Sequence, residues 1–178
     1  MWIALLISIS YISTSNPAVM KTSKFAGSGF RTVVWAAFVT GSLDIMAAFV
    51  VYAIIMDKTT PVQILLSIAS GVFGKGAYEG GNMMAVYGLL FHFLIALAFA
   101  LLYFLIYQYT AFPGKHKLLS GIIYGIFIWV VMNRIVLPIA FSGMPAASWD
   151  AALLGIAIVI LAVGLPIAYI IPTGQRIP

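Results

Sequence analysis

This sequence has no cysteine and few charged residues. It contains no cysteine, so it has no thiol nucleophile, disulfide, iron–sulfur ligand or thiolate zinc site, and membrane oxidoreductases that work through sulfur are excluded. Only 7% of its 178 residues are charged, whereas an ordinary soluble domain has about 25%. Nine basic and four acidic side chains cannot solvate the surface of a 19.2 kDa globule. The composition therefore assigns the chain to a lipid bilayer and leaves its activity open.

Long apolar runs take the place of charge. Hydrophobic residues make up 63% of the chain, and its mean hydropathy is +1.13. A membrane helix needs about 20 mostly apolar residues, because each adds about 1.5 Å and the hydrocarbon core is about 30 Å thick. Four stretches qualify, 33–56, 83–109, 118–141 and 151–171. We therefore predict an all-α integral membrane protein with four transmembrane helices in one domain, 33–171, between a basic N-terminal flank, 1–32, and a tail, 172–178.

A shorter helix is predicted between the first two spans, over 61–73. Thr60 and Gln63 have the spacing of a capping box, and Pro61 occupies the first helical position. Glycines from Gly71 onward end the helix after about 12 residues, or about 18 Å. This length cannot cross the bilayer. The helix either lies on the outer surface or dips in as a re-entrant segment whose irregular end is covered by protein or water.

Basic residues in the flanks predict the orientation. With four spans, the N-terminal flank, the second loop and the C-terminal tail share one side of the membrane, and the other side holds Lys58 and Lys75. Six basic residues lie on the shared side: Lys21, Lys24, Arg31, Lys115, Lys117 and Arg176. Because cytoplasmic segments carry the excess of Lys and Arg, both termini are predicted to be cytoplasmic.

The first 19 residues do not fit this arrangement. The apolar run 2–12 is too short to cross the bilayer, and it lacks the basic n-region of a signal peptide. The segment Met20–Lys24 is typical of a bacterial protein start. We expect either that translation begins at Met20 or that residues 1–19 are a loosely attached extension, and we favour a cleaved signal less.

Aromatic residues mark the ends of two spans. Tyr103, Tyr107 and Tyr109 lie at the inner end of the second span, and Trp149 lies at the outer start of the fourth. Tyrosine and tryptophan are enriched at membrane–water interfaces. We therefore expect these side chains at the two membrane surfaces.

Polar residues inside the spans are the candidate functional residues. Asp44, His92, Asn133 and Arg134 interrupt apolar runs, where ionisable groups are costly and usually face a bundle interior or an aqueous cavity. At 1.5 Å per residue from the cytoplasmic ends, Asp44 lies about 16 Å deep, and His92 and Arg134 about 24 Å. Glu79 adds a carboxylate in the glycine-rich turn before the second span. These five residues predict a polar pocket that opens outward, in which Arg134 can reach Asp44 and form an ion pair.

Small residues accompany these polar groups on their helices. The small residues that share a face with Asp44 or His92 are Ala37, Gly41 and Ala48 in the first span and Ala85, Gly88 and Ala96 in the second. Small residues permit close helix packing, so Asp44 and His92 are expected to face protein. Gly121 and Gly125 form a GxxxG element in the third span, which packs either within the chain or against a second copy in a homodimer.

Several functional interpretations stay open. Asp44 or His92 can change protonation along a path for protons or a small solute, or Arg134 can anchor an anion. The same residues can instead be structural, so that the chain is a non-catalytic accessory subunit. An intramembrane enzyme acting on a lipid or quinone is the least supported, because the sequence has no GxSxG, HExxH, GxGD or GxGxxG motif. No cofactor or metal is expected, and without a basic face outside the membrane flanks neither is nucleic-acid binding.

Short segments of the chain resemble a bacterial family. They are Gly41–Ser42–Leu43–Asp44–Ile45, Ile68–Ala69–Ser70–Gly71, Gly80–Gly81, Gly88–Leu89–Leu90–Phe91–His92–Phe93, Met132–Asn133 and Val136–Leu137–Pro138. Together, over residues 31–138, they resemble the YagU-like proteins, small inner-membrane proteins of unknown function. The resemblance implies the bacterial inner membrane as location, brings no activity or substrate, and places Asp44, His92 and Asn133 in the similar stretches.

Overall fold

The protein is helical throughout the part that the structure describes. The computed structural model describes residues 17–109, 112–141 and 148–171, so the predicted tail and most of the expected extension over 1–19 lie outside the described residues. The elements follow one another as α2 (Pro17–Ala48), π-helix η1 (Phe49–Ile55), α3 (Pro61–Phe73), 3-10 helix η2 (Gly74–Glu79), α4 (Gly81–Tyr109), α5 (Phe112–Lys115), α6 (Lys117–Val131), π-helix η3 (Met132–Val136), α7 (Leu137–Ala140), α8 (Trp149–Val159), π-helix η4 (Ile160–Gly164) and α9 (Leu165–Ile170).

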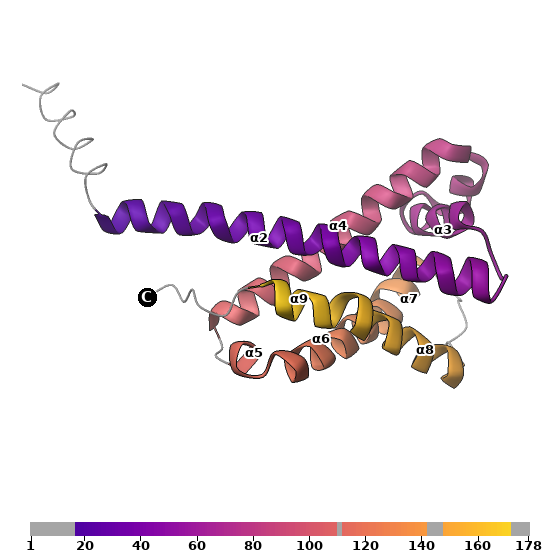
Figure 1. Ribbon diagram of the computed structural model, residues 1–178. Coiled ribbons are helices and arrows are strands. Elements are labelled where there is room, and N and C mark those ends of the chain that lie inside the picture. The colour runs from indigo at the N-terminus through magenta and orange to yellow at the C-terminus, as the bar shows by residue number, and fades with distance from the viewer. Residues whose placement is uncertain (1–16, 110–111, 142–147, 172–178) are drawn as a thin grey trace, which may run out of the picture.

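Four helical runs are long and apolar enough to cross a membrane. They are Gly29–Ile55, Gly81–Gln108, Lys117–Ala140 and Trp149–Ile170, and they confirm the predicted all-α protein with four transmembrane helices. The first span belongs to α2 and η1, the second to α4, the third to α6, η3 and α7, and the fourth to α8, η4 and α9 (Figure 1). Large apolar side chains such as Ile139 and Leu161 are exposed along them, which suits contact with lipid.

Two spans change to a π-helix shortly before a proline. The η3 segment ends two residues before Pro138, and η4 ends two residues before Pro166. Proline cannot donate a hydrogen bond to the carbonyl four residues earlier, and its ring crowds that carbonyl. A local π-helical turn satisfies freed backbone groups and keeps the helix continuous. Both spans therefore continue through their prolines.

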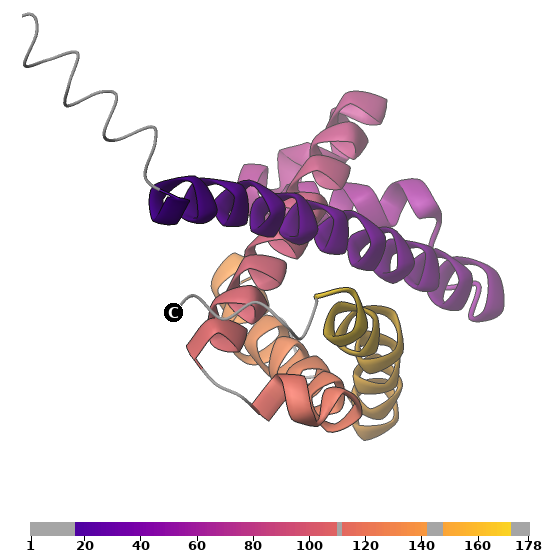
Figure 2. The same ribbon diagram turned by 60° about the vertical axis from the view of Figure 1, so that its left-hand side comes forward.

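The third and fourth spans pack through glycines. A Cβ atom on Gly121 would lie 2.8 Å from the carbonyl oxygen of Gly164, and one on Gly125 would lie 2.7 Å from the Cα of Ile160. These contacts are with backbone, which cannot rotate away. The GxxxG face therefore packs within the chain, and Figure 2 shows the two spans side by side. The structure offers no support for the alternative use of this face in a homodimer.

The α3 helix begins with the predicted capping box. The hydroxyl of Thr60 accepts a hydrogen bond from the Gln63 N–H, and the Gln63 side chain accepts one from the Thr60 N–H, each at 3.2 Å. The helix packs on α4, where Gly88 leaves no room for a Cβ atom against the Leu65 carbonyl. Figure 1 shows α3 nearly end-on while α2 runs across the view. This crosswise placement favours the interfacial alternative over the re-entrant one.

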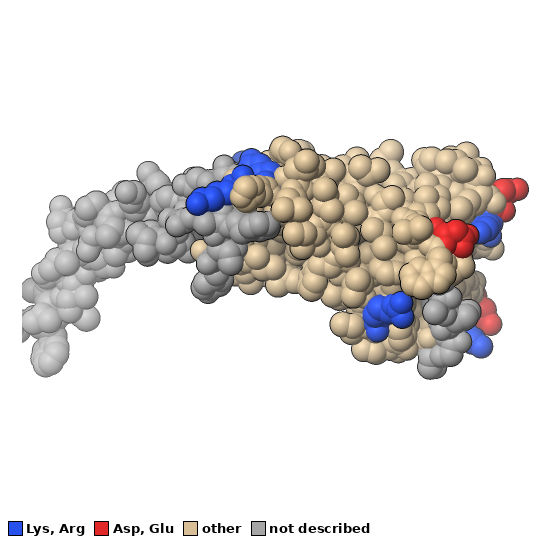
Figure 3. Space-filling view, turned by 90° about the horizontal axis from the view of Figure 1, so that it is seen from below, with Lys and Arg blue, Asp and Glu red and all other residues tan. Residues whose placement is uncertain are grey.

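The bundle has two distinct ends. We call the end with α3 and η2 the α3 end, and the opposite one, with α5, the α5 end. On the face seen in Figure 3, charged side chains gather towards these ends and leave much of the stretch between them uncharged. The N-terminal part of α2 and the C-terminal end of α9 both lie at the α5 end (Figure 1). This arrangement follows from an even number of spans.

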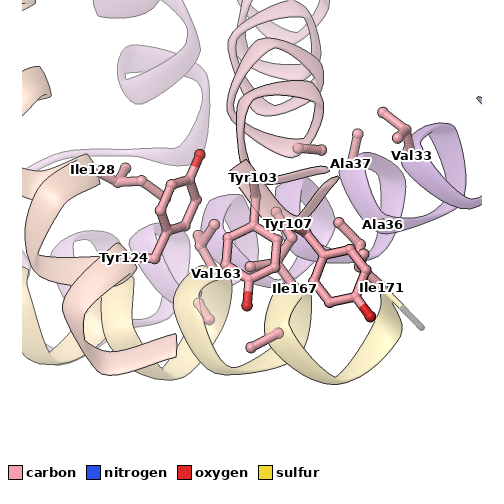
Figure 4. Close-up of a cluster of buried hydrophobic side chains, with 13 residues drawn as sticks. Val33, Ala36, Ala37, Tyr103, Tyr107, Tyr124, Ile128, Val163, Ile167 and Ile171 are labelled. Atoms are coloured by element: carbon pink, nitrogen blue, oxygen red, sulfur yellow. The ribbon is translucent and has the colours of Figure 1, made fainter. Parts of the chain in front are cut away.

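The apolar core lies towards the α5 end. It joins α2, α4, α6, η4 and α9, and Tyr103 and Tyr107 belong to it (Figure 4). The Tyr103 hydroxyl lies 2.8 Å from the Ser120 hydroxyl, and the Tyr124 hydroxyl donates to the Phe99 carbonyl at 2.6 Å. The rings of Tyr103 and Tyr107 therefore fill the seam between spans and do not face lipid as an aromatic belt does, while the side chain of Tyr109 lies outside the described residues. Trp149 is exposed at the start of α8.

Candidate functional site

A cavity of about 340 Å³ lies among the spans. It is bounded by α2, α3, α4, the third span and the fourth span, and nearly all of its wall is apolar. Its volume falls at the lower end of the range of small-molecule pockets, about 300–1,000 Å³. Among the described residues that line it, Asp44 and His92 are the ones that can carry charge. The cavity is therefore the candidate functional site.

Asp44 presents an unpaired carboxylate to this cavity. It is half-buried on α2, and within the described part of the chain its carboxylate makes no hydrogen bond and no ion pair. No buried side-chain oxygen or nitrogen in that part lacks a partner, so the Asp44 oxygens keep accessible surface. Electrostatic interactions link Asp44 to His92 and to Tyr52 on the same span. The carboxylate is thus available to a ligand or a proton.

His92 connects the second span to the first. Its Nε2 atom lies 2.8 Å from the Gly41 carbonyl oxygen. A carbonyl only accepts, so Nε2 carries the proton and donates, and Nδ1 of the neutral ring is left as an acceptor. A Cβ on Gly41 would lie 3.0 Å from the Phe93 ring and 3.1 Å from the Ala96 Cβ. The glycine therefore allows the close packing of α2 and α4 that brings the imidazole to this carbonyl.

Asp44 and His92 lie at the same level in the bundle. Each is about 11 residues, or about 16 Å, from the α3 end of its span, at Ile55 and Gly81. Counting from the predicted cytoplasmic ends put His92 about 8 Å further out than Asp44. That difference is wrong because the first span begins at Gly29, before the predicted boundary, and α4 crosses α2 obliquely (Figure 1).

Arg134 is not part of this site. The structure brings Met132 and Val136 of η3 to the cavity, and Arg134 lies between them in sequence, two residues from each. Two residues correspond to about half a helical turn, so its side chain points away, and it is exposed. No ion pair joins Arg134 and Asp44 in the described part of the chain. The expected pairing is therefore wrong.

Asn133 and Glu79 also lie outside the cavity. The Asn133 amide donates to the Trp129 carbonyl of its own helix at 3.0 Å, which satisfies it locally. Glu79 is exposed at the end of η2. The structure thus brings together two of the five predicted residues, Asp44 and His92.

Sequence reasoning missed the apolar wall that α3 supplies. Ile64, Ile68 and Val72 recur every four residues and line the cavity. This spacing is the signal of one helix face and was available in the sequence. At the opposite side, Ile128 and Val163 belong both to the lining and to the core. The core therefore closes the cavity towards the α5 end.

The lining limits the chemistry of the site. Apart from the carboxylate and the imidazole, its described residues are glycine, aliphatic, methionine or phenylalanine, so it supplies no hydroxyl nucleophile. The described residues also contain no group of three His, Cys, Asp or Glu side chains that could hold a metal ion. The arrangement can bind a small, mostly apolar molecule and can take up or release a proton.

Comparisons with known proteins give no further guide to this site. No family model, curated protein or solved structure matches the chain. The resemblance to the YagU-like proteins stays a prediction, and the interpretation of the site depends on its geometry.

Proposed function

We propose that this membrane protein binds a small solute in the cavity and couples that binding to protonation of Asp44 and His92, in transport or in sensing. The proposal places it in the bacterial inner membrane with both termini cytoplasmic. The α3 end, which holds the cavity, then faces outward. The excess of basic residues in the terminal flanks and second loop supports this orientation.

The unpaired Asp44 carboxylate carries the proposal. A charge at membrane depth is costly unless it is paired or reaches water or a ligand. A purely structural aspartate is expected to have a partner that holds it in place, yet Asp44 has no hydrogen bond or ion pair among the described residues. Its position beside His92 in an otherwise apolar cavity favours a role in binding or proton exchange.

The closed inner side of the cavity favours binding over open conduction. Ile128 and Val163 separate it from the α5 end, and the core with Tyr103 and Tyr124 lies beyond them. A solute or proton that enters from the α3 end stops at this layer. Transport would then require the core to open, whereas sensing would not.

A structural role is the second candidate, and one contact favours it. The hydrogen bond from His92 to the Gly41 carbonyl ties α4 to α2 and needs no ligand. In this alternative the chain is an accessory subunit, and Asp44 contributes only to helix packing. Catalysis is less supported than either, because the described lining offers no hydroxyl nucleophile and the sequence has no GxSxG, HExxH, GxGD or GxGxxG motif.

Infrared titration of the purified protein in nanodiscs separates the two candidates. We expect a protonated carboxyl band from Asp44 that appears as the pH is lowered through the ionisation of this cavity side chain. The band should disappear in Asp44→Asn. The matched control is Asp57→Asn, at the exposed end of the same span, where the backbone φ of 50° is one that asparagine tolerates. A band that persists in Asp44→Asn, or an Asp44 that does not titrate, would overturn the proposal.

A further inference from the structure

The geometry points to a primary amine with an apolar body, bound as the ammonium ion, as the solute of this cavity. This inference rests on the proposed function and specifies its ligand. Three properties of the site carry it: the sign of its charge, the kind of hydrogen bond it can make, and the shape of its apolar wall.

The charge of the described lining is negative when Asp44 is ionised and the His92 ring is neutral. His92 is the one other titratable side chain there, and its Nε2–H is already committed to the Gly41 carbonyl. Arg134 lies outside the cavity, so it does not offset the carboxylate. A cation that enters the cavity supplies the missing partner, whereas an anion meets repulsion in a medium that screens charge poorly.

Apart from the His92 Nε2–H, which donates to the Gly41 carbonyl, the hydrogen-bonding groups of the described lining side chains are acceptors when the His92 ring is neutral. Asp44 offers two carboxylate oxygens, and neutral His92 offers Nδ1, which has no partner in the described part of the chain. An ammonium group has three donors and no acceptor, so it matches this set. A quaternary ammonium ion carries the same charge and no donor. The site therefore distinguishes a primary ammonium from a quaternary one.

The remaining wall fits a compact apolar group. The cavity of about 340 Å³ is equivalent to about 11 water molecules at about 30 Å³ each. Ile64 and Ile68 of α3 face this space together with Phe91 and Phe99 of α4. A ring or a short branched chain on the carbon that bears the ammonium group would leave water and pack against these side chains.

Binding is linked to the proton on Asp44. The groups that interact electrostatically with Asp44 are His92 from α4 and Tyr52 from its own span, while α3 and the third and fourth spans bring only glycine and apolar residues to the lining. An ammonium ion needs the ionised carboxylate, so it displaces one proton wherever Asp44 is protonated beforehand. Its affinity therefore falls about tenfold per pH unit on the acidic side of that ionisation and levels off above it.

Three probes of similar shape test these properties on the full chain in nanodiscs. They are 2-phenylethylammonium, the neutral 2-phenylethanol, and N,N,N-trimethyl-2-phenylethylammonium, and binding to empty nanodiscs is subtracted. Calorimetry or ligand-observed NMR gives the dissociation constants for the unaltered protein, Asp44→Asn and the control Asp57→Asn.

We expect the unaltered protein and Asp57→Asn to bind the primary ammonium at least about tenfold more tightly than the alcohol, a difference of about 1.4 kcal/mol. The trimethyl probe should bind more weakly than the primary ammonium. Asp44→Asn should bind the alcohol as before, which shows that the cavity is intact, and should lose the preference for the ammonium.

Three results would overturn the inference: no preference for the primary ammonium, a preference that survives Asp44→Asn, or equal binding of the trimethyl probe. If one of these occurs while the alcohol binds and Asp44 titrates in the infrared experiment, this inference fails and the proposed function stands. If no probe binds and Asp44 does not titrate, both fail.

Discussion

Gly164→Ala tests the packing that holds the third and fourth spans together. A methyl group at Gly164 would meet the carbonyl oxygen of Gly121, and it would lie 2.9 Å from the nitrogen and 3.0 Å from the Cα of Gly125. Ordinary carbon contacts begin at 3.4 Å. All three neighbours are backbone atoms, so the helices themselves must move apart and lose van der Waals contact along the seam.

Overpacking of this kind costs about 1–3 kcal/mol, and contact with rigid backbone places Gly164→Ala at the upper end, about 3 kcal/mol. The assay is unfolding in mixed detergent micelles, followed by circular dichroism and tryptophan fluorescence. The control is Gly76→Ala on the exposed η2 helix, where a Cβ has no neighbour within 4 Å, and a change below about 0.5 kcal/mol is expected.

A loss of stability below about 0.5 kcal/mol for Gly164→Ala would refute this reasoning. So would a dimer that dissociates in the variant while the stability of the monomer is unchanged, since the glycines would then pack between copies. Size-exclusion chromatography with light scattering measures the oligomeric state of the same samples.

Three further changes probe single contacts. Tyr124→Phe removes the 2.6 Å hydrogen bond to the Phe99 carbonyl and should cost about 1 kcal/mol in the same unfolding assay; no measurable loss would argue against that bond. Thr60→Ala removes the capping box and should destabilise α3 by about 1 kcal/mol, seen as faster hydrogen exchange in that helix and unchanged exchange in α6. Arg134→Gln should leave the infrared titration of Asp44 unchanged, because Arg134 is exposed outside the cavity. A clear shift would indicate that Arg134 and Asp44 do form an ion pair.

Local signals in the sequence were sufficient for the helices. The hydropathy of each span extends over about 20 residues, which leaves little choice of position. The α3 helix has the predicted range because its start is fixed by Thr60 and Pro61 and its end by the glycines that follow. The small residues around Asp44 and His92 likewise predicted a contact between the first two spans, and the Gly41 carbonyl accepts a hydrogen bond at that contact.

The rotation of the third span could not be read from the sequence. Its angular position is set by the glycine contacts with the fourth span and by the π-helical turn before Pro138. A π-turn changes the number of residues per turn, so it changes which side chains face inward beyond it. The sequence predicted Arg134 as a partner for Asp44 from its depth in the membrane alone. The actual rotation turns Met132 and Val136 to the cavity instead.

Tyr103 and Tyr107 illustrate a second limit of prediction from the sequence. Tyrosine has an apolar ring and a polar hydroxyl, so it suits a membrane surface and a core with a hydrogen-bond partner equally well. Tyr103 has such a partner in Ser120, which lies on another helix. A partner of this kind becomes visible only when the two helices are placed next to each other.

Accessibility of the cavity from one side of the membrane tests the account most directly. Because the natural sequence has no cysteine, a single one can be placed in the cavity wall as Ala48→Cys, and at a lipid-facing position of the same helix as Met46→Cys. A charged, membrane-impermeant thiol reagent needs the thiolate, which forms in a hydrated cavity and is suppressed in hydrocarbon. In proteoliposomes of known orientation, the account predicts that Ala48→Cys reacts from the side of the α3 end and not from the α5 end, and that Met46→Cys reacts from neither. Reaction of Ala48→Cys from the α5 end, or from neither side, would contradict the outward-facing cavity.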